Sequence, residues 1–272
     1  MPTAKTQIAK KESTALTTTG YAEMAGAGFE GVDPSHFSPP FINILQSLSA
    51  TVKSKQNSDG DIYNTSSCEA TPGADGITII PCAVKHGYVE WRENRGGFVA
   101  EHPVSSSVVQ KALANPVMEP GKKFPTFKNG NNVLQETFTL YGLLDRGDGV
   151  LDQVIIPFTS TKITAYRHFM STAIGPKLRT ENGELKPYPL CAHRYKFTTK
   201  ADKRASGDSF NWSIKFDGAN ADEARLSPES VEFQAAIEFN EIVKRGNVKE
   251  DYAKSQDTGK ASEQEDDGSI PF

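Results

Sequence analysis

The chain has 272 residues, which is enough for one large domain or two small ones. Its charged and apolar fractions are those of a soluble globular protein. Its formal net charge of −4 belongs to residues 249–272, which hold three lysines and seven acids, so the body before them is electrically balanced. A balanced body argues against tight non-specific binding of duplex DNA, although a groove needs only local positive charge.

The three cysteines, Cys68, Cys82 and Cys191, are far apart, and no pair has metal-ligand spacing. No apolar run near the N-terminus has the form of a signal peptide, and no stretch approaches the length of a membrane span. These features predict a cytoplasmic protein with reduced thiols and no membrane partner. Each cysteine is expected to be a small core residue.

Residues 1–35 are expected to form a flexible N-terminal segment, because they are rich in Thr, Ala, Lys and Gly without an apolar period. The first dense apolar segment, 37–48, contains Pro39-Pro40 and fits a short helix or a buried extended arm. We expect it to pack in the core of its own chain. Docking on a second subunit of a homo-oligomer is the alternative.

Strand patterns dominate between residues 61 and 217. Apolar runs, alternating or continuous, predict strands at 61–63, 76–84, 88–93, 132–144, 150–158, 188–199 and 209–217. A bend at His86-Gly87 is expected to separate the second of these strands from the third. Asp148-Gly149 lies between two apolar runs, which predicts a hairpin turn rather than a calcium loop.

Beyond segment 37–48, three segments carry helical signals. Residues 105–113 and 159–174 fit helices, and the second should end at Gly175-Pro176. Ser227-Pro228 predicts the start of a third helix that runs to about Arg245. We therefore expect a single β-rich domain and a disordered acidic tail, with bounds 36–246 and 247–272.

No enzymatic constellation is visible in the sequence. The five histidines lie without metal-ligand spacing at His36, His86, His102, His168 and His193. We expect a protein that is not an enzyme and uses no cofactor or metal, although residues distant in sequence can meet in a folded active site.

Aromatic side chains are interleaved with cations in three stretches of the chain: 85–98, 122–128 and 194–215. The third stretch ends at Lys215. Single strands of DNA expose both phosphates and flat bases, so their binding proteins use Lys or Arg together with aromatic rings. The candidate DNA-binding residues are Lys85, Tyr88, Trp91, Arg92, Arg95, Phe98, Lys122, Lys123, Phe124, Phe127, Arg194, Lys196, Lys200, Lys203 and Arg204.

Alternation divides these candidates. Along 193–199, Arg194 and Lys196 share the face opposite to Tyr195 and Phe197. We expect the aromatic residues of this strand, and those of 210–216, to pack inward while the cations face solvent. Stacking on bases is expected from the aromatic residues in or near loops, which are Tyr88, Trp91, Phe98, Phe124 and Phe127.

The chain ends in carboxylates followed by an apolar tip, Asp266-Asp267-Gly268-Ser269-Ile270-Pro271-Phe272. Such an arm can insert its terminal Phe into a pocket on a partner, or lie in a basic groove of its own chain. Asp266, Asp267, Ile270, Pro271 and Phe272 resemble the tip of bacterial single-stranded-DNA-binding proteins, although Gly268-Ser269 stands where that family usually has another acid. Podophage single-stranded-DNA-binding proteins likewise end in acids and a terminal Phe.

The resemblance implies an oligonucleotide/oligosaccharide-binding (OB) fold, so we expect a mostly-β, elaborated OB-fold-like barrel with a few helices. It also implies a phage protein of DNA replication or recombination that coats single-stranded DNA without sequence specificity in the host cytoplasm. The five tip residues would recruit a polymerase, helicase, primase or nuclease. One alternative is a strand-annealing recombination protein. Another is an adaptor that binds no DNA and docks its tip on a host protein.

Overall fold

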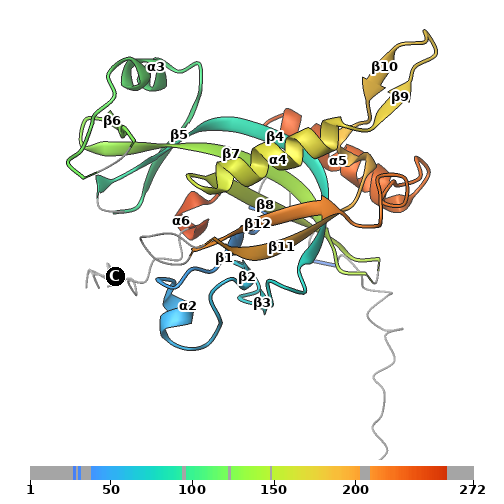
Figure 1. Cartoon of the computed structure of the whole chain (residues 1–272), viewed down its shortest axis with the longest axis horizontal. Helices are drawn as coiled ribbons and strands as arrows, with labels where there is room; N and C mark the ends of the chain where they lie inside the picture. The colour runs from blue at the N-terminus through green and yellow to red at the C-terminus, as the bar shows by residue number, and fades with distance from the viewer. Residues whose placement is uncertain are drawn as a thin grey trace, which may run out of the picture.

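The computed structural model describes residues 27–28, 30–31, 38–93, 96–121, 124–147, 149–202 and 209–255. Its strands are β1 (Ile42–Ile44), β2 (Ile62–Asn64), β3 (Ala70–Thr71), β4 (Ile77–Trp91), β5 (Phe98–Pro103), β6 (Phe127–Asn129), β7 (Asn132–Asp145), β8 (Leu151–Thr159), β9 (Lys177–Arg179), β10 (Leu185–Pro187), β11 (Tyr195–Asp202) and β12 (Ser209–Phe216). Its helices are α2 (Ala50–Lys53), α3 (Ser107–Ala114), α4 (Lys162–Ile174), the 3-10 turn η3 (Leu190–Ala192), α5 (Val231–Lys244) and α6 (Tyr252–Ser255). The mostly-β prediction is confirmed (Figure 1).

Two long antiparallel strands, β4 and β7, form the spine of the main sheet. They pair from Thr78 opposite Asp145 to Trp91 opposite Val133. β11 and β12 extend the sheet beside the start of β4, and β8 extends it beside the end of β7. β5 and β6 pair with the other halves of the two long strands. The sheet therefore divides into two parts. We call the part with β8, β11 and β12 the body, and the part with β5 and β6 the wing, which carries α3 (Figure 1).

Residues 38–48, which we call the N-terminal arm, bridge the two edges of the body. At the β8 edge, the N–H of Ile155 donates to the carbonyl of Pro40 (2.9 Å). At the β12 edge, the side-chain amide of Gln46 bonds both the N–H and the carbonyl of Phe210 (3.0 and 3.1 Å). None of the described sheets closes by continuous strand pairing. The main sheet is therefore open, and not the closed barrel that the resemblance implied. The N-terminal arm links its two edges by hydrogen bonds.

The arm packs in the core of its own chain, as expected. Phe41, Ile42, Ile44 and Leu45 are each at most 3% exposed, while Leu48 faces solvent. A second copy of the chain is therefore not needed to cover these four side chains.

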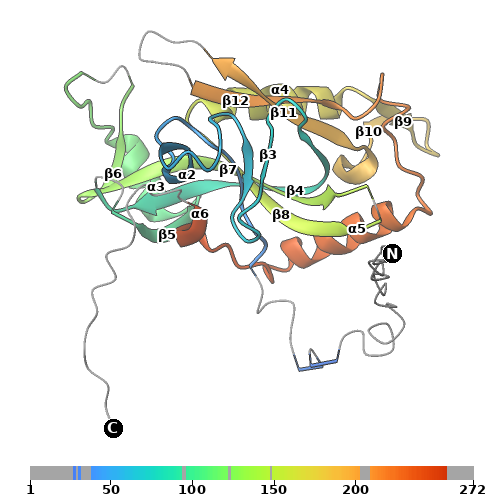
Figure 2. The same cartoon turned by 90° about the horizontal axis from the view of Figure 1, so that it is seen from below.

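Strand alternation places the main core on one face of the sheet. Tyr195, Phe197 and Trp212 are at most 2% exposed and share a cluster with Phe169 of α4. The inward packing predicted for these strands is confirmed. Phe239 of α5 belongs to a second cluster on the opposite face of the sheet, so α4 and α5 cover opposite sides (Figures 1 and 2).

Several local expectations need correction. β4 runs through His86-Gly87 as one strand, because β7 pairs with it continuously. Gly87 serves close approach instead of a bend, since a Cβ there would lie 2.9 Å from the carbonyl oxygen of His102 in β5. α5 begins after Ser230, whose hydroxyl accepts from the N–H of Phe233 (3.2 Å), and not at Ser227. β5 and the β9–β10 hairpin were not anticipated.

The folded domain continues past residue 246. Tyr252 is 2% exposed, and its ring centroid lies 5.3 Å from that of Phe41 and 5.5 Å from that of Phe98. The side-chain amide of Asn43 donates to the carbonyl of Ser255 (3.0 Å). We call residues 248–255 the C-terminal strap. Because the strap is part of the core, the predicted start of the tail at residue 247 is too early.

Candidate nucleic-acid interface

The β11–β12 hairpin presents a row of cations on its outer face, which we call the cationic ribbon (Lys196, Lys200 and Lys215). Lys196 and Lys215 are cross-strand partners, so their side chains leave the same side of the hairpin. Lys200 lies four residues further along the same side, about 13 Å from Lys196, since alternate residues of a strand share a face. Lys200 and Lys215 are exposed and Lys196 is half-buried.

Within the described ranges, which exclude loop 203–208, the three lysines of the ribbon have no ion pair and no side-chain hydrogen bond. Two other cations around the sheet are engaged: Lys128 pairs with Glu119 (2.9 Å), and Arg146 pairs with Asp152 (2.6 Å). Unpaired charges on the back of a buried hairpin keep a fixed spacing and remain available for phosphates. Their arrangement suits an extended polyanion.

A groove with a volume of about 670 Å³ opens beside the ribbon. Lys196 belongs to the ribbon and also lines the groove. Its lining includes Glu69 and Thr71 of the β2–β3 hairpin. The start of β4, the β7–β8 turn and the start of β11 also contribute lining residues. Thr199 fixes this arrangement, because its N–H donates to the carbonyl of Gly73 (2.9 Å) and ties β11 to the segment after β3.

Arg194 lies in the groove between two carboxylates. Its guanidinium lies 2.8 Å from Glu232 and 3.2 Å from Asp145. The backbone N–H of Glu232, at the start of α5, and the Arg194 charge hold the pKa of Glu232 below its usual value, so this carboxylate stays ionised. Arg194 faces outward as predicted. Its charge is largely compensated, so it is a weaker phosphate ligand than the lysines of the ribbon.

The first predicted stretch, 85–98, is mostly internal. Tyr88 and Trp91 are 5% and 9% exposed. Tyr88 forms a T-shaped ring contact with Phe127, and Trp91 forms one with Phe98. These ring faces are covered because β4 remains a paired strand to Trp91. We therefore leave these aromatic residues out of the proposed interface. Arg92 is exposed, without a partner in the part of the chain that the structure describes.

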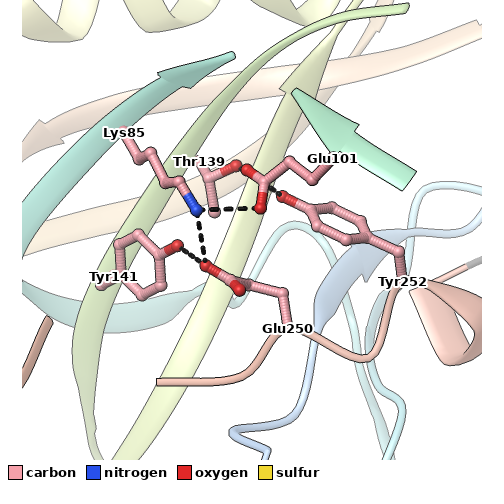
Figure 3. Close-up of polar contacts among 6 residues, drawn as sticks. All are labelled: Lys85, Glu101, Thr139, Tyr141, Glu250 and Tyr252. Atoms are coloured by element: carbon pink, nitrogen blue, oxygen red, sulfur yellow. Dashed lines mark hydrogen bonds and ion pairs between the residues drawn. The ribbon is translucent and has the colours of Figure 1, made fainter. Parts of the chain in front are cut away.

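Lys85, also in that stretch, is bound by acids of its own chain (Figure 3). Its ammonium lies 2.8 Å from Glu101 and 3.3 Å from Glu250 of the C-terminal strap. Burial opposes the charge on Lys85, but the hydrogen bond to Glu101 and the charge of Glu250 outweigh it and raise its pKa. Tyr141 donates to the same Glu250 carboxylate, and the hydroxyls of Tyr252 and Thr139 lie 3.1 Å apart. Lys85 thus holds the strap.

The second predicted stretch contains one strongly exposed ring, Phe124, which is 72% exposed on the loop before β6. Phe127 is half-buried against the wing core. The remaining candidates lie outside the described residues, and they are Arg95, Lys122, Lys123, Lys203, Arg204, Asp266, Asp267, Ile270, Pro271 and Phe272.

Two groups at this site were missed. Lys215 is not among the candidate DNA-binding residues predicted from the sequence. Pairing the strands on either side of loop 203–208 would have placed it opposite Lys196. The groove carboxylates Glu69 and Asp217 come from segments far apart in the chain, and no local pattern joins them.

The described ranges contain no group of three or more His, Cys, Asp or Glu side chains positioned for a metal ion. They also contain no helix with the length and apolarity to cross a bilayer. Cys82 and Cys191 are buried as expected, whereas Cys68 is exposed on the β2–β3 turn.

The chain was compared with known proteins. A family model described as "Pam3 phage gp34-like protein" matches residues 9–249. The search of curated proteins and the search of solved structures returned no match.

Proposed function

The chain belongs to the Pam3 phage gp34-like protein family, and from this premise we propose that it is a phage single-stranded-DNA-binding protein that holds the strand on its cationic ribbon. The phage origin agrees with part of the resemblance seen in the sequence. The binding function, a place in phage replication or recombination, and an action in the host cytoplasm belong to the proposal.

The observation that carries the proposal is the fixed row of three unpaired lysines. The other face of the hairpin packs on the core through Tyr195, Phe197 and Trp212, which holds the backbone of Lys196 and Lys200 in place. Lys196 and Lys200, about 13 Å apart along the strand, can contact alternate phosphates of an extended single strand, and Lys215 lies beside Lys196 on the neighbouring strand. Lys203 and Arg204, in the loop that joins β11 to β12, add two cations to this end of the hairpin in the sequence.

The C-terminal tip supplies the second part of the proposal. Residues 266–272 combine two carboxylates with Ile-Pro-Phe, which suits an apolar pocket with a basic rim on a replication or recombination protein. The strap ends at Ser255 beside β1, and seventeen residues follow it in the sequence. An extended chain of that length reaches at most about 60 Å. A partner on the tip would therefore stay close to the bound strand.

The direct test is fluorescence anisotropy with a labelled single-stranded oligonucleotide of mixed sequence and a duplex of equal length. Intrinsic fluorescence is a poor readout, because Trp91 and Trp212 are both buried. We expect preference for the single strand and a steep loss of affinity with salt. No binding at low salt would refute the proposal and favour an adaptor. Preference for a partly paired intermediate over the single strand would favour a strand-annealing protein.

Deletion of residues 263–272 separates the two parts of the proposal. The deletion should leave DNA affinity unchanged or raise it, because it removes four acids and no ribbon residue. Capture of the partner protein should be lost. A large loss of DNA affinity in this variant would contradict the division between a DNA-binding body and a protein-binding tip.

A further inference from the structure

The groove beside the cationic ribbon has a chemistry different from that of the ribbon. Its lining includes four carboxylates, from Glu69, Asp145, Asp217 and Glu232, and three cations, from Arg146, Arg194 and Lys196. Leu144 and Leu151 add apolar surface to the lining. A groove with this charge balance repels phosphates, so the sugar-phosphate backbone would stay on the lysines outside it.

Two of the carboxylates keep free acceptor capacity. Oδ2 of Asp217 accepts from the hydroxyl of Thr78 (2.8 Å), and Oδ1 has no hydrogen bond to a described residue. The carboxylate of Glu69 is exposed and likewise lacks a partner in the described ranges. In contrast, Asp145 and Glu232 are occupied by Arg194. The groove lining thus combines apolar surface with solvent-accessible carboxylate oxygens that can accept hydrogen bonds from a ligand.

Nucleobases differ in how they meet such acceptors. Cytosine, adenine and guanine carry exocyclic amino groups, and carboxylates accept from these donors, as from cytosine N4. Thymine has a carbonyl oxygen where these bases have the amino group, and its one donor on that edge, the N3 imino group, is flanked by two carbonyl oxygens. A carboxylate placed to accept from an amino group would therefore face a thymine oxygen without a proton between them. Burial of an acceptor without a donor is unfavourable, so the groove discriminates between the two kinds of base.

We propose that this groove is a nucleobase-binding site that favours amino-bearing bases over thymine, with Glu69 and Asp217 as the acceptors. The inference rests on the proposed function, because the phosphates on the ribbon bring the bases to the groove. Lys196 stands at the border between the two surfaces and lines both. The protein would coat any single strand and bind cytosine-rich segments more tightly than thymine-rich ones.

The test compares labelled oligo-dC with oligo-dT of equal length on the full chain, at neutral pH, by anisotropy. We expect oligo-dC to bind about tenfold more tightly, which corresponds to about 1.4 kcal/mol of discrimination. Glu69→Gln should bring the two affinities closer together, since the new side-chain N–H₂ can donate to thymine oxygens. Asp217→Asn should act in the same direction. Glu238→Gln, an exposed acid on α5 outside the groove, is the matched control and should keep the preference.

The outcomes separate this inference from the proposed function. Equal affinity for the two oligonucleotides, tighter binding of oligo-dT, or an unchanged ratio in both groove variants overturns the nucleobase site and leaves DNA binding intact. Failure of both oligonucleotides to bind at low salt overturns the proposed function itself. A preference for oligo-dC that is lost in Glu69→Gln and kept in Glu238→Gln supports the inference.

Discussion

Removal of the Tyr252 side chain is a sharp test of the C-terminal strap, because one side chain provides most of its buried contacts. The ring is 2% exposed between Phe41 and Phe98, and its hydroxyl lies 3.1 Å from that of Thr139. Truncation of a buried aromatic residue to Ala costs about 3–5 kcal/mol. The strap can detach locally, which limits the loss, so we expect about 3 kcal/mol for Tyr252→Ala.

The assay is urea unfolding followed by circular dichroism, together with a thermal melt. A loss of about 3 kcal/mol should lower the melting temperature by about 6–12 °C for a domain of this size. Tyr252→Phe removes only the hydroxyl and should cost about 1 kcal/mol. Lys254→Ala, on the exposed side of the strap, is the control and should stay within about 0.5 kcal/mol of wild type. A Tyr252→Ala protein as stable as that control would show that the strap is not docked.

Three further outcomes follow from charged side chains of the folded domain. Lys85→Gln should lower the urea midpoint, because Glu101 and Glu250 lose their shared cation, while the salt dependence of DNA binding stays unchanged. Burial alone would raise the pKa of Glu90, but hydrogen bonds from Asn132, His102 and Asn129 outweigh it and lower the pKa. Its folded pKa is therefore below its unfolded value of about 4.3, so its contribution to stability is present above that pH and is lost as the pH falls through the folded pKa. Urea midpoints between pH 3 and 7 should fall more steeply in wild type than in Glu90→Gln, and parallel profiles would contradict this assignment. Burial lowers the pKa of Lys162 to about 8, so wild-type stability should rise as the pH passes from 8 to about 10.4. Lys162→Met should accordingly raise the urea midpoint at pH 7, and the gain should shrink toward pH 10; a gain that does not change with pH would refute the shift.

Strand alternation predicted the part of the site that depends on local periodicity. Tyr195 and Phe197 point inward and Lys196 points outward because side chains of a strand alternate whatever the tertiary fold. The same rule placed most strands of the sheet. The register that sets Lys215 opposite Lys196 needs only the length of the loop between the two strands.

Features made by distant segments could not be read in this way. The strap sequence, 248–255, is polar and charged, and only its docking on Phe41 and Phe98 reveals Tyr252 as a core residue. Tyr88 and Trp91 were expected on a separate short strand near a loop, because His86-Gly87 suggested a bend, whereas Gly87 admits β5 beside a continuous β4. The carboxylates of the groove come from four separate segments, so no motif announces them.

The most direct test of the account is the salt dependence of single-strand binding in a triple variant of the ribbon, Lys196→Glu, Lys200→Glu and Lys215→Glu. Its control reverses three exposed cations away from the ribbon, Lys111, Lys177 and Arg245, and so changes the net charge equally. Each lost phosphate contact should reduce the slope of log K against log salt by about 0.7, hence by about 2 in all. We expect that reduction, with at least about a tenfold loss of affinity, in the ribbon variant alone. Equal slopes in the two variants would contradict a DNA-binding ribbon on β11 and β12.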